Sequence, residues 1–183
     1  MNVSELCAKI TAELHEVLSS IDPQEPQELI SQIQKAKRIF IAGAGRSKLI
    51  LSAFAMRLMQ IGFNVYVVGE IVTPAICPGD LLIIGSGSGK TKSLVLHAQT
   101  AINLGVTVFL ITTNRSSTLA SISDFSLTLP VARDKKSEKY ISFQPGASAF
   151  EQSLMIFLDA VILKIMETSD PDISVKTLHA NLE

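Results

Sequence analysis

Two stretches of this sequence join a short apolar run to a turn rich in glycine and serine, and this pairing constrains the fold more than any other feature. The apolar runs are residues 39–42 and 81–84, and the turns that follow them are residues 43–47 and 85–91. A helical pattern begins directly after each turn. A buried strand, a tight glycine turn and a helix, in that order, are typical of a parallel sheet in an α/β protein.

The remainder of the chain continues this alternation. Strands are expected at residues 38–42, 64–68, 81–84, 107–112 and 125–129, and helices at residues 1–20, 26–36, 47–61, 91–104, 117–122 and 147–166. Strands that alternate with helices form right-handed crossovers, which place helices on both faces of a parallel sheet. The sequence therefore predicts an α/β fold: one three-layer α/β/α domain with a doubly wound, five-stranded parallel sheet.

The expected domain spans residues 1–183, with N-terminal helices in 1–36, the sheet and its helices in 37–168, and a C-terminal tail in 169–183. Apolar spacing in the helix after the first turn predicts its buried face, which comprises Leu49, Ala53, Met56, Met59 and Gln60.

Composition limits the class of protein and its partners. The 183 residues are 47% hydrophobic, which suits a sheet covered on both faces and further burial between subunits. A net charge of −1 argues against a nucleic-acid or anionic-membrane partner. Cys7 and Cys77 form neither a disulfide framework nor a metal-binding spacing. Without a recognisable signal peptide or an apolar run of transmembrane length, we expect a cytoplasmic protein.

Both turns suit a phosphate group. Glycine allows the backbone to approach an anion closely, the following helix offers unpaired N–H groups, and hydroxyls add neutral donors. We therefore expect a small phosphorylated ligand, bound without metal or cofactor by residues of the two turns: Gly45, Arg46, Ser47, Ser86, Gly87, Ser88, Gly89, Lys90 and Thr91. Arg46 pairs either with the phosphate or with a carboxylate of a neighbouring subunit. Lys90 either adds charge near the phosphate or is solvated at a helix start.

Two nucleotide-binding patterns fit this chain poorly. The P-loop pattern needs glycine at position 84, where this chain has Ile84, and the dinucleotide pattern needs glycine at position 48, where it has Lys48. A third interpretation, in which both turns are only strand-to-helix connections with N-capping serines, stays open.

Several stretches of the chain, in their order and spacing, resemble the sugar isomerase (SIS) domain family and, within it, the 6-phospho-3-hexuloisomerases. These stretches are residues 42–47, 54–58, 62–70, 79–89, 144–146, 150–153 and 179–183. The resemblance implies a five-stranded parallel sheet and a homotetramer. It also implies conversion of D-arabino-hex-3-ulose 6-phosphate to D-fructose 6-phosphate, the second step of formaldehyde fixation by the ribulose monophosphate route.

The resemblance also implies roles for individual residues. Ser47 and residues 86–91 would bind the phosphate and the sugar, and Glu151 would be the catalytic base. His179 would lie on a tail that reaches a neighbouring subunit's site and would move protons between substrate oxygens or assist ring opening. Glu151 falls near the start of the last helix, where the helix dipole favours negative charge. Glu70, after the second strand, is the rival base.

Some residues depart from the family pattern. Lys48 and Lys90 replace a glycine and a glutamate, Leu178 replaces an arginine, and residues 146–149 replace a methionine- and glycine-rich segment. Because these positions surround the ligand, an isomerase of another sugar phosphate is one alternative. A non-catalytic phosphosugar sensor is another, although no basic helix-turn-helix segment precedes the sheet. His15 and His97 are expected to be surface or packing residues.

Overall fold

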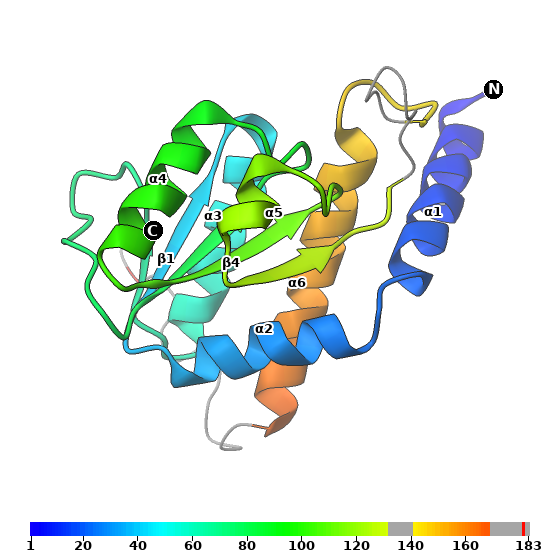
Figure 1. Cartoon of the computed structure of the whole chain (residues 1–183). Coiled ribbons are helices and arrows are strands. Elements are labelled where there is room, and N and C mark those ends of the chain that lie inside the picture. The colour runs from blue at the N-terminus through cyan, green and yellow to red at the C-terminus, as the bar shows by residue number, and fades with distance from the viewer. Residues whose placement is uncertain (132–140, 169–180, 182–183) are drawn as a thin grey trace.

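The structure, a computed structural model, describes residues 1–131, 141–168 and 181. Its centre is a parallel sheet of five strands in the order β2-β1-β3-β4-β5 (Figure 1). The strands are β1 (Ile39–Gly43), β2 (Val65–Val67), β3 (Leu81–Gly85), β4 (Thr107–Thr112) and β5 (Phe125–Thr128). The predicted α/β class and the five-stranded parallel sheet are confirmed. The chain moves outward in one direction from β1 and in the other from β3, as expected for a doubly wound sheet.

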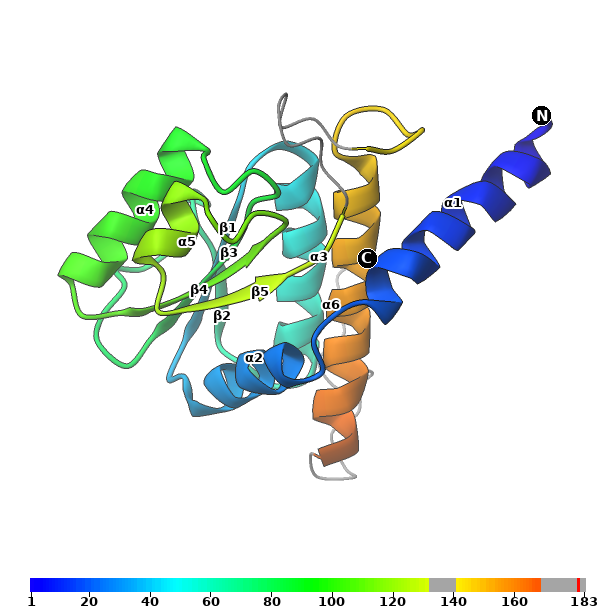
Figure 2. The same cartoon turned by 45° about the vertical axis from the view of Figure 1, so that its right-hand side comes forward.

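Helices cover both faces of this sheet (Figure 2). They are α1 (Val3–Ser19), α2 (Gln24–Lys35), α3 (Gly45–Gln60), α4 (Lys92–Asn103), α5 (Thr118–Ile122) and α6 (Ser148–Thr168). One core cluster joins the sheet to α2, α3 and α6, and a second joins it to α4 and α5. The central strands β1, β3 and β4 are buried along nearly their whole length, which explains their continuous apolar sequence.

The predicted buried face of α3 was wrong for most of its members. Leu49, Met56 and Met59 are 71%, 44% and 41% exposed, although Gln60 is buried as expected. The residues that face the sheet and α6 are Leu51, Phe54, Ala55 and Leu58. Apolar residues surround this helix on almost every side, so helical spacing fits more than one face. The packing of α3 against both the sheet and α6 decides which face is buried.

An ion pair links the chain just before β1 to the chain just before β3. Arg38, just before β1, donates from Nε and Nη2 to the carboxylate of Asp80, just before β3, at 3.0 and 2.6 Å. The backbone N–H of Cys77 also donates to this carboxylate, at 2.8 Å. Burial raises the pKa of Asp80, but these hydrogen bonds and the Arg38 charge outweigh it, so the pKa lies below its ordinary value.

The first helix is only half supported by the rest of the domain. Asn2 and Glu5 form a capping box at its start. Near its end Leu14 and Val17 are buried, and α1 contacts α6. Val3, in contrast, is 76% exposed, and the first turns project away from the body of the molecule (Figure 2). Across the described ranges, we find no helix with both the length and the hydropathy needed to cross a membrane.

Candidate active site

The two glycine- and serine-rich turns meet at one cavity of about 210 Å³. It lies at the carboxyl ends of β1 and β3, which are neighbours in the sheet with Gly43 opposite Gly85. The strand order reverses between these two strands, and ligands of open α/β sheets bind at such a point. The cavity is lined by Ala44, Ser47, Gly85, Ser86, Gly87, Ser88, Thr91, Leu94, Ala147 and Phe150.

Close packing explains the glycines beneath this cavity. A Cβ atom on Gly85 would lie 2.7 Å from Cδ1 of Leu51, so a larger residue would push α3 away from the strand. Gly89 has a φ of +64°, and a Cβ atom there would lie 2.0 Å from Oγ of Ser117. Glycine at these two positions therefore brings the turns close to α3 and α5.

Hydrogen bonds within the second turn hold its hydroxyls in place. Oγ of Ser86 accepts from the backbone N–H of Gly89 at 3.2 Å and lies 3.4 Å from Oγ1 of Thr91. Oγ of Ser88 accepts from the backbone N–H of Lys90 at 3.2 Å. Because the serine oxygens act as acceptors, their own protons can be donated to a ligand. The turn is thus ordered by backbone donors, while the hydroxyl of Ser88 and one of the hydroxyls of Ser86 and Thr91 can still donate.

The helix starts beside the cavity are uncapped. Neither Ala44, the N-cap residue of α3, nor Thr91, the N-cap residue of α4, forms a side-chain capping hydrogen bond. Asn2 and Ser117, by contrast, cap α1 and α5 through their side chains. Within the described part of the chain, the first N–H groups of α3 and α4 thus have no side-chain partner beside the cavity, where an anion would satisfy them. The helix α2, away from the cavity, also begins without a side-chain cap, at Pro23. Because neither turn supplies a capping side chain to the helix that follows, the interpretation of their serines as ordinary N-caps is disfavoured.

A carboxylate and a guanidinium form an ion pair, and each directly adjoins, in the sequence, a residue that lines the cavity. Glu151 lies in the first turn of α6, next to the lining residue Phe150 and one turn after Ala147. Oε2 of Glu151 accepts from Nε of Arg46 at 2.7 Å. The Glu151 side chain is 11% exposed and that of Arg46 62% exposed. Arg46 thus pairs with a carboxylate of its own chain, an arrangement that sequence reasoning did not anticipate.

The rival base is placed differently. Glu70 follows β2 and lies 3.6 Å from Nζ of Lys48, and its side chain is 60% exposed. Neither glutamate is among the described residues that line the cavity. Glu151 directly follows the lining residue Phe150 and is buried, whereas Glu70 has no lining residue next to it in the sequence, so Glu151 is the nearer of the two along the chain.

Residues 32–163 match the family model of the SIS domain. This chain belongs to the SIS domain family. It is 45% identical to a Bacillus subtilis protein named 3-hexulose-6-phosphate isomerase, with 100% of both chains covered. A Mycobacterium gastri protein of the same name is 40% identical and covers 93% of this chain and 86% of its own. A crystal structure from Methanococcus jannaschii, from which a 3-hexulose-6-phosphate isomerase function was inferred, covers 98% of this chain and 99% of its own at 34% identity, with a TM-score of 0.84.

Other predicted residues of this SIS domain lie away from the cavity or outside the described part. His179 and Leu178 fall in residues 169–180, outside the described residues. Lys90 is exposed at the turn before α4, and His15 is exposed on α1. His97 is half-buried on α4 and lines a separate hollow. Within residues 1–131 and 141–168, no three His, Cys, Asp or Glu side chains come together as a metal site would require.

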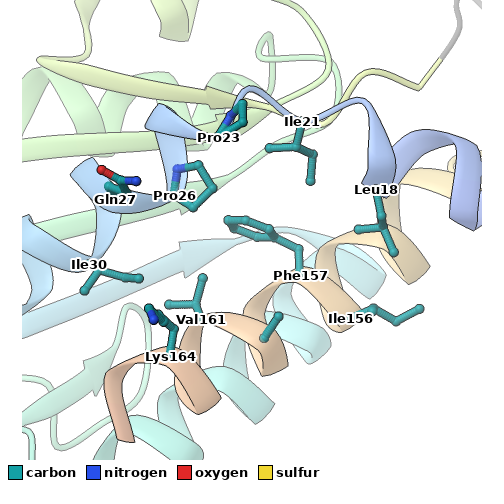
Figure 3. Close-up of a pocket in the computed structure, with 11 residues that line it drawn as sticks. Leu18, Ile21, Pro23, Pro26, Gln27, Ile30, Ile156, Phe157, Val161 and Lys164 are labelled. Atoms are coloured by element: carbon teal, nitrogen blue, oxygen red, sulfur yellow. The ribbon is translucent and has the colours of Figure 1, made fainter. Parts of the chain in front are cut away.

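Five lining residues of the SIS cavity were not among the predicted binding residues: Ala44 and Gly85, which lie in the two turns, and Leu94, Ala147 and Phe150. Ala147 lies three positions before Phe150 and four before Glu151, the predicted base. This helical spacing could have grouped Ala147 and Phe150 with the base. A larger hollow of about 450 Å³ lies between the end of α1, α2 and α6 (Figure 3). Its lining is mainly apolar, with Phe157 at its centre, and lacks the donor-rich turns that suit a phosphate.

Proposed function

We propose that this protein is an isomerase that converts D-arabino-hex-3-ulose 6-phosphate to D-fructose 6-phosphate through a cis-enediol. The observation that carries the proposal is a cavity built from two donor-rich turns, with the buried Glu151 directly after the lining residue Phe150. The full-length similarity to proteins named 3-hexulose-6-phosphate isomerase supports the same substrate and reaction.

In this proposal the phosphate is bound in the cavity by neutral donors. The hydroxyls of Ser47, Ser86, Ser88 and Thr91 would donate to its oxygens, together with the first N–H groups of α3 and α4. Gly45, Gly87 and Gly89 would let the backbone approach the ligand, while Arg46 and Lys90 would supply positive charge. Neutral donors select a phosphate by geometry, since they fit its tetrahedral oxygens at the strand ends.

Glu151 would then remove the proton from C2 of the 3-ketose and return it to C3. Between these steps the C2–C3 bond is an enediol, and the proton on O2 must move to O3 so that the carbonyl ends at C2. His179, reaching the site from a neighbouring subunit, would carry this second proton. Phe150 is fully buried beside Glu151 and would exclude water from the reacting carbons.

We also propose a cytoplasmic homotetramer in which the single SIS domain covers residues 1–183 and its tail, residues 169–183, completes a neighbouring site. Exposed apolar side chains on three helices support subunit contacts: Val3, Leu49, Met56, Met59, Met155, Ile156 and Leu163. Both cysteines are free, in keeping with a reducing compartment. Light scattering of the pure protein should give the mass of four chains, and a monomer mass would contradict this part.

The decisive experiment is an assay of fructose 6-phosphate formation with and without Glu151. The wild type should turn over the 3-ketose phosphate without added metal, and Glu151→Gln should lower kcat by about 10²- to 10⁴-fold while substrate is still bound. Glu167→Gln, an exposed glutamate on the same helix, is the matched control. Full activity in Glu151→Gln would exclude this base, and binding without turnover by the wild type would indicate a sensor.

A second substrate is favoured by one specific observation. Lys48, which replaces a glycine of the family pattern, directly follows the cavity residue Ser47 and pairs with Glu70, so a charge pair adjoins a lining residue. A panel of pentose, hexose and heptose phosphates would reveal another substrate through a higher kcat/KM. In the same panel, Glu70→Gln should retain activity if Glu151 is the base.

A further inference from the structure

The proposed base is engaged in an ion pair in this structure. Oε2 of Glu151 accepts a charge-assisted hydrogen bond from Nε of Arg46 at 2.7 Å. Only 11% of the glutamate side chain is exposed, and one of its two oxygens is engaged by the guanidinium. A substrate proton and Arg46 would therefore compete for this carboxylate.

The phosphate cavity next to this pair lacks a charge of its own. None of the ten described residues that line it is charged. A phosphate bound there would carry up to two negative charges, against one on Glu151. Arg46 directly precedes the lining residue Ser47, whereas Lys48 is already paired with Glu70. Lys90 also adjoins a lining residue, Thr91, but the contact with Glu151 is made by Arg46. Arg46 is therefore the cation that links the cavity to the proposed base.

Movement of Arg46 requires little repacking. Its side chain is 62% exposed, so its long stem can rotate through solvent. The glutamate is held on α6 and nearly buried, so it cannot follow the guanidinium. Of the two partners, Arg46 is the one that can change position.

We propose that Arg46 exchanges partners during catalysis: it leaves Glu151 for the phosphate of the bound substrate, and this exchange frees the carboxylate to accept the C2 proton. The inference rests on the proposed function, since it takes Glu151 as the base. Phosphate binding then does more than hold the sugar, because it also makes the base available. A sugar without a phosphate would meet a carboxylate that is still paired.

The test divides the substrate into two pieces. D-arabino-hex-3-ulose, without its phosphate, is assayed with wild type and Arg46→Met in the presence and absence of phosphite dianion. Phosphite should raise the wild-type kcat/KM for the neutral sugar about ten- to hundredfold, the range expected for one charge-assisted contact. In Arg46→Met it should raise kcat/KM less than twofold, and the value without phosphite should equal or exceed that of wild type.

The intact phosphorylated substrate provides a second readout. With it, Arg46→Met should raise KM at least about tenfold and leave kcat within a few-fold, and Arg46→Lys should recover part of the loss. Arg57→Met changes an exposed arginine on the same helix and controls for folding. Its kinetics should match those of wild type.

The outcomes separate this inference from the proposed function. If the wild type fails to isomerise the phosphorylated sugar, both fail. If it succeeds, but phosphite leaves wild-type turnover of the neutral sugar unchanged, the exchange is wrong and the proposed function stands. Equal activation of Arg46→Met by phosphite, or lower neutral-sugar turnover by this variant than by wild type, also overturns the exchange.

Discussion

The contact between the second turn and α5 gives a sharp prediction for Gly89→Ala. A Cβ atom at this position would lie 2.0 Å from Oγ and 2.4 Å from Cβ of Ser117. Ser117 is buried and caps α5 through a hydrogen bond from the backbone N–H of Ala120. Its side chain therefore cannot move away without loss of the cap.

Two costs add in this variant. A non-glycine residue at a φ of +64° costs about 1–2 kcal/mol, and overpacking of a buried contact costs about 1–3 kcal/mol more. We expect Gly89→Ala to lower the free energy of unfolding by about 3–4 kcal/mol. Gly146→Ala has nearly the same φ, +60°, and nothing within 4 Å of the new Cβ, so it should cost only the conformational part.

A double-mutant cycle isolates the steric part. Ser117→Gly removes both clashing atoms. Because glycine is tolerated at an N-cap, this change alone should lower the free energy of unfolding by only about a few tenths of a kcal/mol. The double variant Gly89→Ala/Ser117→Gly should then be about 2 kcal/mol more stable than Gly89→Ala alone. Urea unfolding followed by circular dichroism, at one protomer concentration, measures all four proteins. Additive effects in this cycle would refute the steric argument.

Two further changes test the ion pairs that join distant segments. Asp80→Asn weakens the hydrogen bonds from Arg38 and should cost about 2 kcal/mol at pH 7 in urea unfolding. Because the folded-state pKa of Asp80 is lowered, this stabilisation is complete above the unfolded-state value of about 4 and is lost as the pH falls through the folded-state value. The difference in the free energy of unfolding between wild type and Asp80→Asn should therefore narrow only below about pH 4. A difference that disappears near neutral pH would contradict this. Glu25→Gln should cost about 1–2 kcal/mol, because Glu25 accepts from Arg115 and from the backbone N–H of Thr128 at 2.8 Å; an unchanged midpoint would count against it.

The fold could be predicted because each buried strand is a continuous apolar run between turn residues. The run 81–84 has no polar interruption, and its neighbours at 39–42 and 107–112 read the same way. The buried face of α3 could not be predicted by the same means. Leu49 and Leu51 fit helical spacing equally well, and only the packing of α3 against the sheet and α6 makes Leu51 the buried one.

The site could be predicted in part, for a related reason. The turns lie at a common edge of the sheet because parallel strands end together, so Ser47 and Ser86 could be grouped from the sequence. The pairing of Arg46 with Glu151 could not, because these residues lie on helices about a hundred positions apart and their contact depends on how α3 packs against α6. Side-chain partners across two helices leave no periodic signal in either one.

The projecting start of α1 has a consequence for deuterium uptake. Roughly ten helical residues without a supporting surface are marginally stable in water, so their amides should exchange almost as fast as those of a peptide. The amides around Leu14 and Val17, which are buried, should exchange far more slowly. Slow exchange at Val3 and Leu6 would then indicate that a second copy of the chain covers the first turns of α1. Hydrogen exchange in these turns can therefore be used to detect subunit association.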